Sequence, residues 1–477
     1  MKEIMKRKRT DLFSSFIFSF LFKNKIFLFK TIIACLFFYA IILGFTNPSK
    51  EENSYTTALF WGLFWSFFMT VSLGSLGRVF CGICPHGFIG KYITKIGLKK
   101  KIPKKLANPF IGLGIILIGY WLLITIFPGI YSGPYNTAIF FAILTVLAVV
   151  FYFLYEDMAY CKYICPLGTV TKTFSKISFA KLETYSKGCS TCTTFDCVKS
   201  CSYDLKPFTF AKKNSMDDCT LCMDCAVSCD NVAFNLQKPS SSLLSKFKTK
   251  KVEVWTLLIL TAILSFSMTL KHTLNRTNIA DEFIWNKIAA SLKSFFPNSY
   301  INIDALCVFL FSIISIVTLN MIGMYIASRI MKIEYEKTFY TLTYALIPLF
   351  IIGGLSHVGE FFFVHYSSII LNGFNEGLSL GFSTFEPLSS RGDSWLVIFK
   401  ACTYIAFIWA FIIMIYRMKL LNAKKSLKVI AYPFASIVII AYMILPFYVG
   451  YVVKTYGAKK GAHNHSSIEL KIKEVNS

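Results

Sequence analysis

Eight cysteines in one polar segment have the residue type and the spacing to bind iron–sulfur clusters. Two tandem blocks with the spacings C-x2-C-x4-C-x3-C and C-x2-C-x2-C-x3-C contain Cys189, Cys192, Cys197, Cys201, Cys219, Cys222, Cys225 and Cys229. In the second spacing, three thiolates hold one [4Fe–4S] cluster and the fourth thiolate holds a neighbouring cluster. Two such blocks in tandem therefore predict two [4Fe–4S] clusters.

The two blocks are expected to exchange their fourth cysteines. Short gaps let three sulfurs contact one face of a cluster, and the x3 step carries the last cysteine away on a turn of helix. We expect one cluster to be bound by Cys189, Cys192, Cys197 and Cys229, and the other by Cys219, Cys222, Cys225 and Cys201. Zinc is the main alternative, but zinc sites separate their C-x2-C pairs by a longer loop. Disulfides are the other alternative, but they would need an oxidising compartment, and the charge distribution described below places this segment in the cytoplasm.

Four further cysteines occur in two similar short motifs. Each motif has an aromatic residue, a cysteine pair, a proline and a glycine, and the pairs are Cys81 with Cys84 and Cys161 with Cys165. We expect them at the inner ends of two membrane helices that pack together. They are candidate redox thiols or metal ligands, and plain packing of small apolar side chains is the alternative. Nearby cations would lower the thiol pKa values, and these are Arg78, Lys91 and Lys162.

These cysteines lie in a chain whose composition is that of a membrane protein. It has 477 residues, of which 55% are hydrophobic and 48 are Phe. A span needs about 20 apolar residues, and nine segments qualify: 26–46, 55–74, 108–127, 136–155, 254–270, 303–326, 339–357, 395–416 and 428–452. The fifth is the shortest. We predict an all-α polytopic membrane protein with about nine transmembrane helices and a small ferredoxin-like insert with two [4Fe–4S] clusters.

The distribution of charge predicts how the chain is oriented. The net charge of +25 is concentrated in residues 1–25 and 75–107, with seven and eight Lys or Arg, whereas the loops 47–54 and 128–135 contain only Lys50. This is the asymmetry of a bacterial inner-membrane protein and not of a nucleic-acid-binding protein. It places the N-terminus and the cluster segment in the cytoplasm, and nine spans place the C-terminus in the periplasm. The brief apolar stretch 11–22 is expected at the membrane interface, and no cleavable signal peptide is expected.

The chain is expected to have three parts. Residues 1–155 form a four-helix membrane unit, 156–252 form the cytoplasmic ferredoxin-like segment, and 253–477 form a five-helix membrane unit with a polar tail. His357 and Glu360 near the end of the seventh span are a conceivable quinol site, although interfacial polar residues are the plainer interpretation. No haem-binding histidine pair and no flavin-attachment sequence is evident. His463 and His465 in the tail would bind a metal weakly at most.

The two cysteine-pair motifs, followed by the paired cluster blocks, resemble the NapH/NosR family of polytopic iron–sulfur proteins over about residues 25–235. That family includes membrane quinol dehydrogenase subunits, MauN proteins and the more distant CcoG. The resemblance implies electron transfer between quinone dissolved in the membrane lipid, iron–sulfur clusters and a redox partner protein that is periplasmic or membrane-associated. It also implies functional roles for the four motif cysteines. The first motif has two residues between its cysteines where the family usually has three, and the five C-terminal spans match no part of the family.

Three functions therefore compete at the level of sequence. The first is a quinol-linked electron-transfer protein, which the two tandem clusters favour. The second is an iron–sulfur or thiol reductase that assists copper-cofactor assembly, for which only His86 lies near the motif cysteines as an extra ligand. The third is a non-redox transporter or scaffold with structural or sensory clusters, which would need more charge within the C-terminal spans than Lys400 and few others provide.

Overall fold

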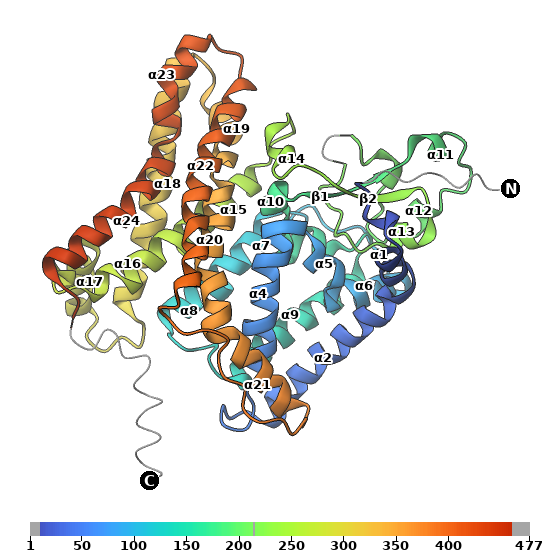
Figure 1. The fold of residues 1–477 in the computed structure, drawn as a ribbon, viewed down its shortest axis with the longest axis horizontal. Coiled ribbons are helices and arrows are strands. Elements are labelled where there is room, and N and C mark those ends of the chain that lie inside the picture. Colours follow the sequence, from blue (N-terminus) through green and yellow to red (C-terminus); the bar gives the residue numbers. More distant parts are fainter. Residues whose placement is uncertain (1–9, 213–214, 460–477) are drawn as a thin grey trace.

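Long apolar helices dominate the computed structural model, which describes residues 10–212 and 215–459 (Figure 1). Eight helices in the described part are long and apolar enough to cross a membrane, and one further apolar helix is shorter. The eight are Phe16–Thr46, Tyr55–Leu76, Pro134–Leu154, Lys251–Arg276, Ile303–Met331, Tyr335–Gly377, Ser394–Lys419 and Ile437–Tyr456. With the shorter helix they correspond to the nine predicted segments, which confirms the predicted fold class.

The structure corrects the prediction of which span is shortest. The short apolar helix is the third one, Phe110–Ile126, whereas the fifth extends over Lys251–Arg276 and is largely buried. The prediction failed because Ser, Thr and Lys residues at the ends of the fifth segment lower its hydropathy. These residues continue the helix as α15 (Lys251–Thr261) and α16 (Met268–His272), joined by a π-helical turn.

The N-terminal membrane unit contains the two helix hairpins that carry the cysteine pairs. Its main helices are α2 (Ile26–Thr46), the span Tyr55–Leu76 that includes α4 (Trp65–Phe67), the short helix that contains α7 (Phe110–Gly114) and α8 (Leu123–Ile126), and α9 (Pro134–Leu154). The proline at the first turn of α9 is favourable because its missing N–H would have no helical acceptor there.

The insert is built on one antiparallel strand pair. Strand β1 (Ala180–Thr184) pairs with β2 (Val232–Leu236), with Leu182 opposite Phe234. Between them come the short helices α11 (Ser186–Ser190), α12 (Asp196–Lys199) and α13 (Asp224–Ser228), next to which the eight cysteines lie. The two strands bring the ends of the cysteine segment together.

The segment before the first span also belongs to this insert, which corrects part of the interfacial prediction for residues 11–22. Asp11 is buried, and its carboxylate accepts hydrogen bonds from Phe13 N at 3.0 Å, Phe234 N at 3.1 Å and the Tyr185 hydroxyl at 2.9 Å. Phe13 packs in the apolar core of the insert. Short hydrophobic segments near a span look interfacial in sequence, but these first residues cover the strand pair instead, before α1 (Phe16–Phe20) begins the helix.

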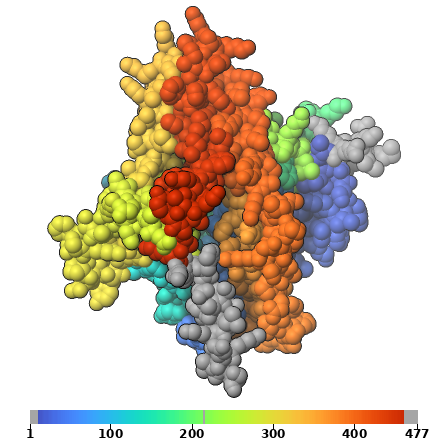
Figure 2. All heavy atoms as spheres, turned by 60° about the vertical axis from the view of Figure 1, so that its left-hand side comes forward, coloured from blue at the N-terminus to red at the C-terminus, as the bar shows by residue number. Residues whose placement is uncertain are grey.

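The C-terminal membrane unit contains the long helix α18 (Ile303–Met331). It adds α17 (Ile284–Phe295), α19 (Tyr335–Leu342), α20 (Ile347–Phe361), α21 (Ser367–Gly377), α22 (Val397–Lys419), α23 (Lys425–Ala435) and α24 (Ile437–Tyr456). Figure 2 shows these helices, in yellow to red, forming one face of the molecule. The seventh span, predicted to end at residue 357, continues through α21 to Gly377.

Small residues let the two membrane units approach closely. A side chain at Gly373 would meet the Ala58 methyl group, and one at Gly377 would meet the Tyr55 ring. Such close helix crossings at small residues are typical of membrane proteins. The extension of α21 therefore packs the C-terminal unit against the second span. The division of the chain at residues 155 and 252 stays a prediction.

Candidate functional site

Each cysteine-pair motif marks a helix start at the end of a membrane hairpin. Cys84 caps α6 (Pro85–Ile96) and Cys165 caps α10 (Pro166–Phe174), so that both prolines occupy the first helical turn. Proline is favourable there, and the Cys165 sulfur accepts a hydrogen bond from Gly168 N at 3.3 Å. The repeated C-P pattern thus produces the same local geometry twice.

The structure brings the four motif cysteines together at one cavity of about 60 Å³. Its lining includes Cys81, Cys84, Cys161 and Cys165, from both hairpins. The Cys81 sulfur lies 3.3 Å from Thr171 Oγ1, and the Cys161 sulfur lies 2.9 Å from the Tyr152 hydroxyl. We call these four residues the four-cysteine site. Its role as a redox or metal site stays a prediction.

Burial controls the protonation of this site, which contradicts the expected lowering of the thiol pKa values. Burial raises the pKa of Cys84 to about 12, with neighbouring Cys161 adding to the effect, and raises that of Cys165 well above its usual range. The three expected cations have other partners: Lys91 pairs with Asp224 at 3.2 Å, Lys162 pairs with Asp157 at 3.7 Å, and Arg78 donates to protein oxygens. As free thiols these groups stay protonated at neutral pH, so thiolates here would require a bound metal.

His86 is the other potential ligand at the four-cysteine site. Its ring lines the same cavity, and its Nε2 lies 2.8 Å from Thr145 Oγ1. Burial lowers the pKa of His86 to about 4, so the imidazole is neutral at pH 7. No group of three or more His, Cys, Asp or Glu within the described ranges is placed to hold a single metal ion.

The structure groups one predicted set of cluster ligands around a second small cavity. Cys201, Cys219, Cys222 and Cys225 all line a cavity of about 10 Å³. Burial raises the pKa of Cys225 well above its usual range, and the nearby sulfurs of Cys222, Cys219 and Cys201 add to this. Four converging thiols are a donor set suited to an iron–sulfur cluster. The fourth donor comes from the first block, as the spacing predicts.

The other predicted set gathers around Cys197 at the outer part of the insert. Burial raises the pKa of Cys197 to about 11, with further contributions from the adjacent Cys229, Cys189 and Cys192. Cys192 is partly exposed, and a hydrogen bond from the backbone of Phe195 lowers the pKa of its thiol. This donor set also fits an iron–sulfur cluster. We call the two sets the inner group (Cys201, Cys219, Cys222, Cys225) and the outer group (Cys189, Cys192, Cys197, Cys229). Their ligand assignments stay predictions.

The inner group lies directly against the four-cysteine site. A side chain at Gly82, between Cys81 and Cys84, would collide with the carbonyl group of Leu221, so only glycine allows this contact. Thr220 lines both cavities. Tyr203 lines the cavity of the inner group and hydrogen-bonds Cys161 of the four-cysteine site. The two sites are therefore separated by single layers of side chain.

Arg78, which is expected from the sequence to lie near the motif thiols, is buried between the two sites. Its side chain is 4% exposed and donates to the Asp217 carbonyl at 2.9 Å and to Thr171 Oγ1 at 3.3 Å. Both Cys81 and Cys219 lie close enough to favour its charged form. Arg78 thus places one positive charge between the four-cysteine site and the inner group. The sequence signal was its position three residues before the first motif cysteine.

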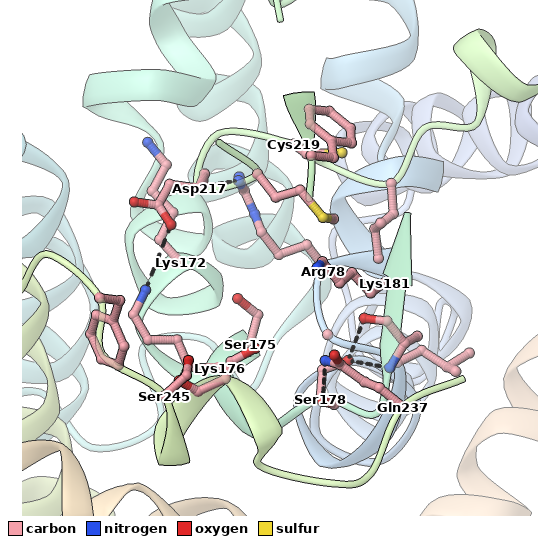
Figure 3. A pocket seen from close by; sticks show the side chains of 18 of the residues that line it. Arg78, Lys172, Ser175, Lys176, Ser178, Lys181, Asp217, Cys219, Gln237 and Ser245 are labelled. Atoms are coloured by element: carbon pink, nitrogen blue, oxygen red, sulfur yellow. Dashed lines mark hydrogen bonds and ion pairs between the residues drawn. The ribbon is translucent and has the colours of Figure 1, made fainter. Parts of the chain in front are cut away.

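A polar cavity of about 370 Å³ opens beside Cys219 (Figure 3). Two of its cations have acidic partners: Lys172 pairs with Asp218 at 2.6 Å, and Lys176 pairs with Glu253 at 3.1 Å. Asp217 adds an ion pair with Lys250 at 2.7 Å. Asp217 and Asp218 thus join the loop before Cys219 to α10 and to the start of the fifth span. The cavity is therefore best explained as part of the junction between the insert and the membrane units.

A family model described as a 4Fe-4S binding domain matches residues 57–105 and 137–183. Each matched range contains one membrane hairpin end and one cysteine pair, so that the match covers Cys81, Cys84, Cys161 and Cys165. The eight cysteines of the insert lie outside both ranges. The match therefore covers the repeated hairpins and their cysteine pairs, and the cysteine spacing of the insert is a separate indication of iron–sulfur binding.

Three relatives share part of the chain. Two uncharacterized proteins of Methanocaldococcus jannaschii are each 28% identical, over 34% and 33% of this chain and 72% and 64% of their own length. YccM of Escherichia coli, provisionally named an electron transport protein, is 25% identical over 37% of this chain and 56% of its length. The chain thus spans about two thirds or less of most of these relatives. No solved structure matches.

These findings support a multi-pass membrane protein with a 4Fe–4S ferredoxin-type domain and a role in iron–sulfur electron transfer.

Proposed function

We propose that this protein passes electrons between a membrane quinol and a redox partner protein, with the four-cysteine site and the insert as successive parts of one relay. The contact between them carries the proposal: Gly82 lies against the Leu221 carbonyl and Thr220 lines both cavities, so that a single layer of side chain separates the four-cysteine site from the inner group. Iron–sulfur clusters bound by the insert would supply one-electron transfer. The overall reaction would convert quinol into quinone, release two protons to water and deliver two electrons to the partner.

The protein's own residues would position and insulate this relay. Leu182, Phe210 and Tyr203 are buried and line the cavity of the inner group. Each group has one buried cysteine and three that are partly exposed. The order of the two groups in the relay therefore rests on the contact of the inner group with the four-cysteine site, and the outer group would face the partner protein.

We further propose that the protein lies in a bacterial inner membrane with the insert in the cytoplasm. The basic end of α22 contacts the insert linker, because Arg417 donates to the carbonyl groups of Leu243 and Ser245 at 3.2 Å each. At the opposite end, Lys459 N donates to the Arg276 carbonyl at 2.8 Å, which places the last described residues near the far end of the fifth span. Cations near the insert support the positive-inside orientation. The chain's end, with His463 and His465, lies outside the described residues.

The resemblance to the NapH/NosR family is the reason for choosing quinol as the electron donor. The copper-handling alternative has one observation in its favour, which is that neutral His86 lines the four-cysteine cavity. Against it stands the absence, among the residues described, of any set of side chains placed to hold one metal ion.

A turnover assay tests the proposal. The protein would be purified anaerobically, placed in lipid nanodiscs and mixed with a short-tail quinol and a soluble one-electron acceptor. We expect quinol oxidation that depends on the protein and acceptor reduction with two electrons per quinol. Protein that contains its iron and sulfide but oxidises no quinol would contradict the proposed donor.

A reporter fusion tests the orientation in the membrane. A reporter fused after Lys212 is expected to show cytoplasmic behaviour, and a periplasmic result would contradict the orientation.

A further inference from the structure

An aromatic cavity lies where the two membrane units meet. Its volume is about 100 Å³, and its walls come from the second span, the short third helix, α9, α10 and two helices of the C-terminal unit. Aromatic side chains dominate the lining on the N-terminal side. Leu260, Leu264 and Phe350 close the cavity from the C-terminal unit. The cavity therefore exists only because the two units are packed together.

One polar group in this apolar lining lacks a partner. Trp121 is 6% exposed, and its Nε1–H has no hydrogen-bond acceptor in the part of the chain that the structure describes. By contrast, Trp61, which lines the same cavity, donates its Nε1–H to Thr137 Oγ1 at 2.9 Å. Buried indole N–H groups are normally paired, and at membrane depth no bulk water can serve. The Trp121 indole therefore indicates a ligand that brings an acceptor oxygen.

The aromatic cavity adjoins the four-cysteine site. The two cavities share six lining residues, Phe64, Phe80, Phe141, Leu144, Pro166 and Leu167. A ring bound among the aromatic side chains would thus be one side-chain layer from the cysteines. At about 100 Å³ the cavity is smaller than the engineered apolar cavity of about 150 Å³ that holds benzene, so a quinone ring would enter it only if the lining side chains move apart.

We propose that this cavity binds the head ring of a membrane quinone, with Trp121 Nε1–H donating to a ring oxygen. The proposal rests on the proposed function and adds the place of binding. Flat aromatic walls favour a stacked ring, and the buried, unpaired Trp121 Nε1–H requires an acceptor that a lipid acyl chain lacks. The site gives the C-terminal unit a role, which is to close the ring pocket. His357, the candidate from the sequence, is exposed and packs against Phe361 with the two rings tilted, outside this lining.

Binding measurements in quinone-free nanodiscs test the site. Calorimetry would compare a short-tail naphthoquinone with a naphthalene that has the same tail but no ring oxygens. Trp121→Phe keeps the apolar volume and removes the donor, so we expect about tenfold weaker quinone binding and unchanged binding of the naphthalene. Trp395→Phe, which removes an exposed indole outside the cavity, is the matched control and should leave both affinities unchanged.

A cavity-filling variant provides the second arm. Leu264→Phe should abolish binding of both compounds while the thermal unfolding midpoint stays within a few degrees of the parent. Unchanged quinone affinity in both Trp121→Phe and Leu264→Phe, with quinol turnover intact, would overturn this site and leave the proposed function standing. Equal weakening of quinone and naphthalene by Trp121→Phe would also overturn it, because the cavity would then be a lipid-filled void. A parent protein that neither binds quinone nor oxidises quinol would overturn the proposed function itself.

Discussion

The insert and the four-cysteine site assemble four thiols in two different ways. In the insert, each block places its cysteines within 13 residues, and only the last cysteine of each block is exchanged. At the four-cysteine site, the two pairs come from hairpins about 80 residues apart in the chain and meet only through helix packing. Loop spacing can therefore specify a cluster site directly, whereas a site made by helix ends depends on the tertiary fold.

The two regions also differ in the protonation of their thiols. Hydrogen bonds lower the pKa of Cys192 in the outer group, whereas burial raises the pKa values of Cys84 and Cys165 at the four-cysteine site. This difference suits a path from the membrane to a soluble partner.

The largest effect is expected from removing an inner-group cysteine. Cys222→Ala should lower the iron content from about eight to about four atoms per chain, because the inner group would lose its cluster. Elemental analysis with acid-labile sulfide measures this. Cys307→Ala, a buried cysteine in α18, is the control and should keep all the iron. Bound zinc without visible charge-transfer absorption in the parent would contradict both cluster assignments.

At the four-cysteine site, Cys84→Ala should reduce quinol turnover by at least about a hundredfold and leave the EPR signals of the insert unchanged. The reason is that the eight insert cysteines form two complete ligand sets without Cys84. The EPR spectrum and the turnover rate are compared with those of Cys402→Ala, a cysteine on α22. If parent iron exceeds about eight atoms and falls in Cys84→Ala, the four-cysteine site itself binds a metal centre. Unchanged turnover would reduce these cysteines to packing residues.

The charge between the two regions can be removed with Arg78→Gln. We expect the free energy of unfolding to fall by about 2–3 kcal/mol, because a buried charged donor loses its hydrogen bonds to Asp217 O and Thr171 Oγ1. The reduction potential of the inner group should also become more negative, since a nearby positive charge favours the reduced cluster. Denaturant titration and an EPR redox titration measure the two effects. A potential unchanged from that of Arg329→Gln would show that Arg78 has only a structural role.

The smallest effect concerns the segment that covers the strand pair. Asp11→Ala should destabilise the insert by about 2 kcal/mol, because Phe13 N and Phe234 N would lose their buried acceptor. Asp230→Ala breaks the solvent-exposed pair with Lys23 and should cost less than about 1 kcal/mol. Hydrogen exchange of the β2 amides reports on both. Equal protection in the two variants would mean that Asp11 does not hold the segment on the insert.

Much of the fold could be predicted because membrane helices and cluster loops are locally encoded. Long apolar runs located the nine helices, and cysteine spacing predicted two groups of four, including the exchange of Cys201. The thiol pKa values could not be predicted, because they depend on how deeply helix packing buries Cys84 and Cys165. The hydrogen bonding of Arg78 and Trp121 could not be predicted either. Arg78 donates to Asp217 O on an element distant in sequence, and helix packing buries Trp121 Nε1 without an acceptor.

Rapid-freeze EPR after anaerobic mixing with quinol tests most directly whether electrons pass from the membrane through the four-cysteine site to the insert. We predict that reduced [4Fe–4S] signals grow within one turnover in the parent and in Cys402→Ala. In Cys84→Ala the same signals should appear with dithionite but not with quinol. Quinol reduction of the insert at the parent rate in Cys84→Ala would contradict the account.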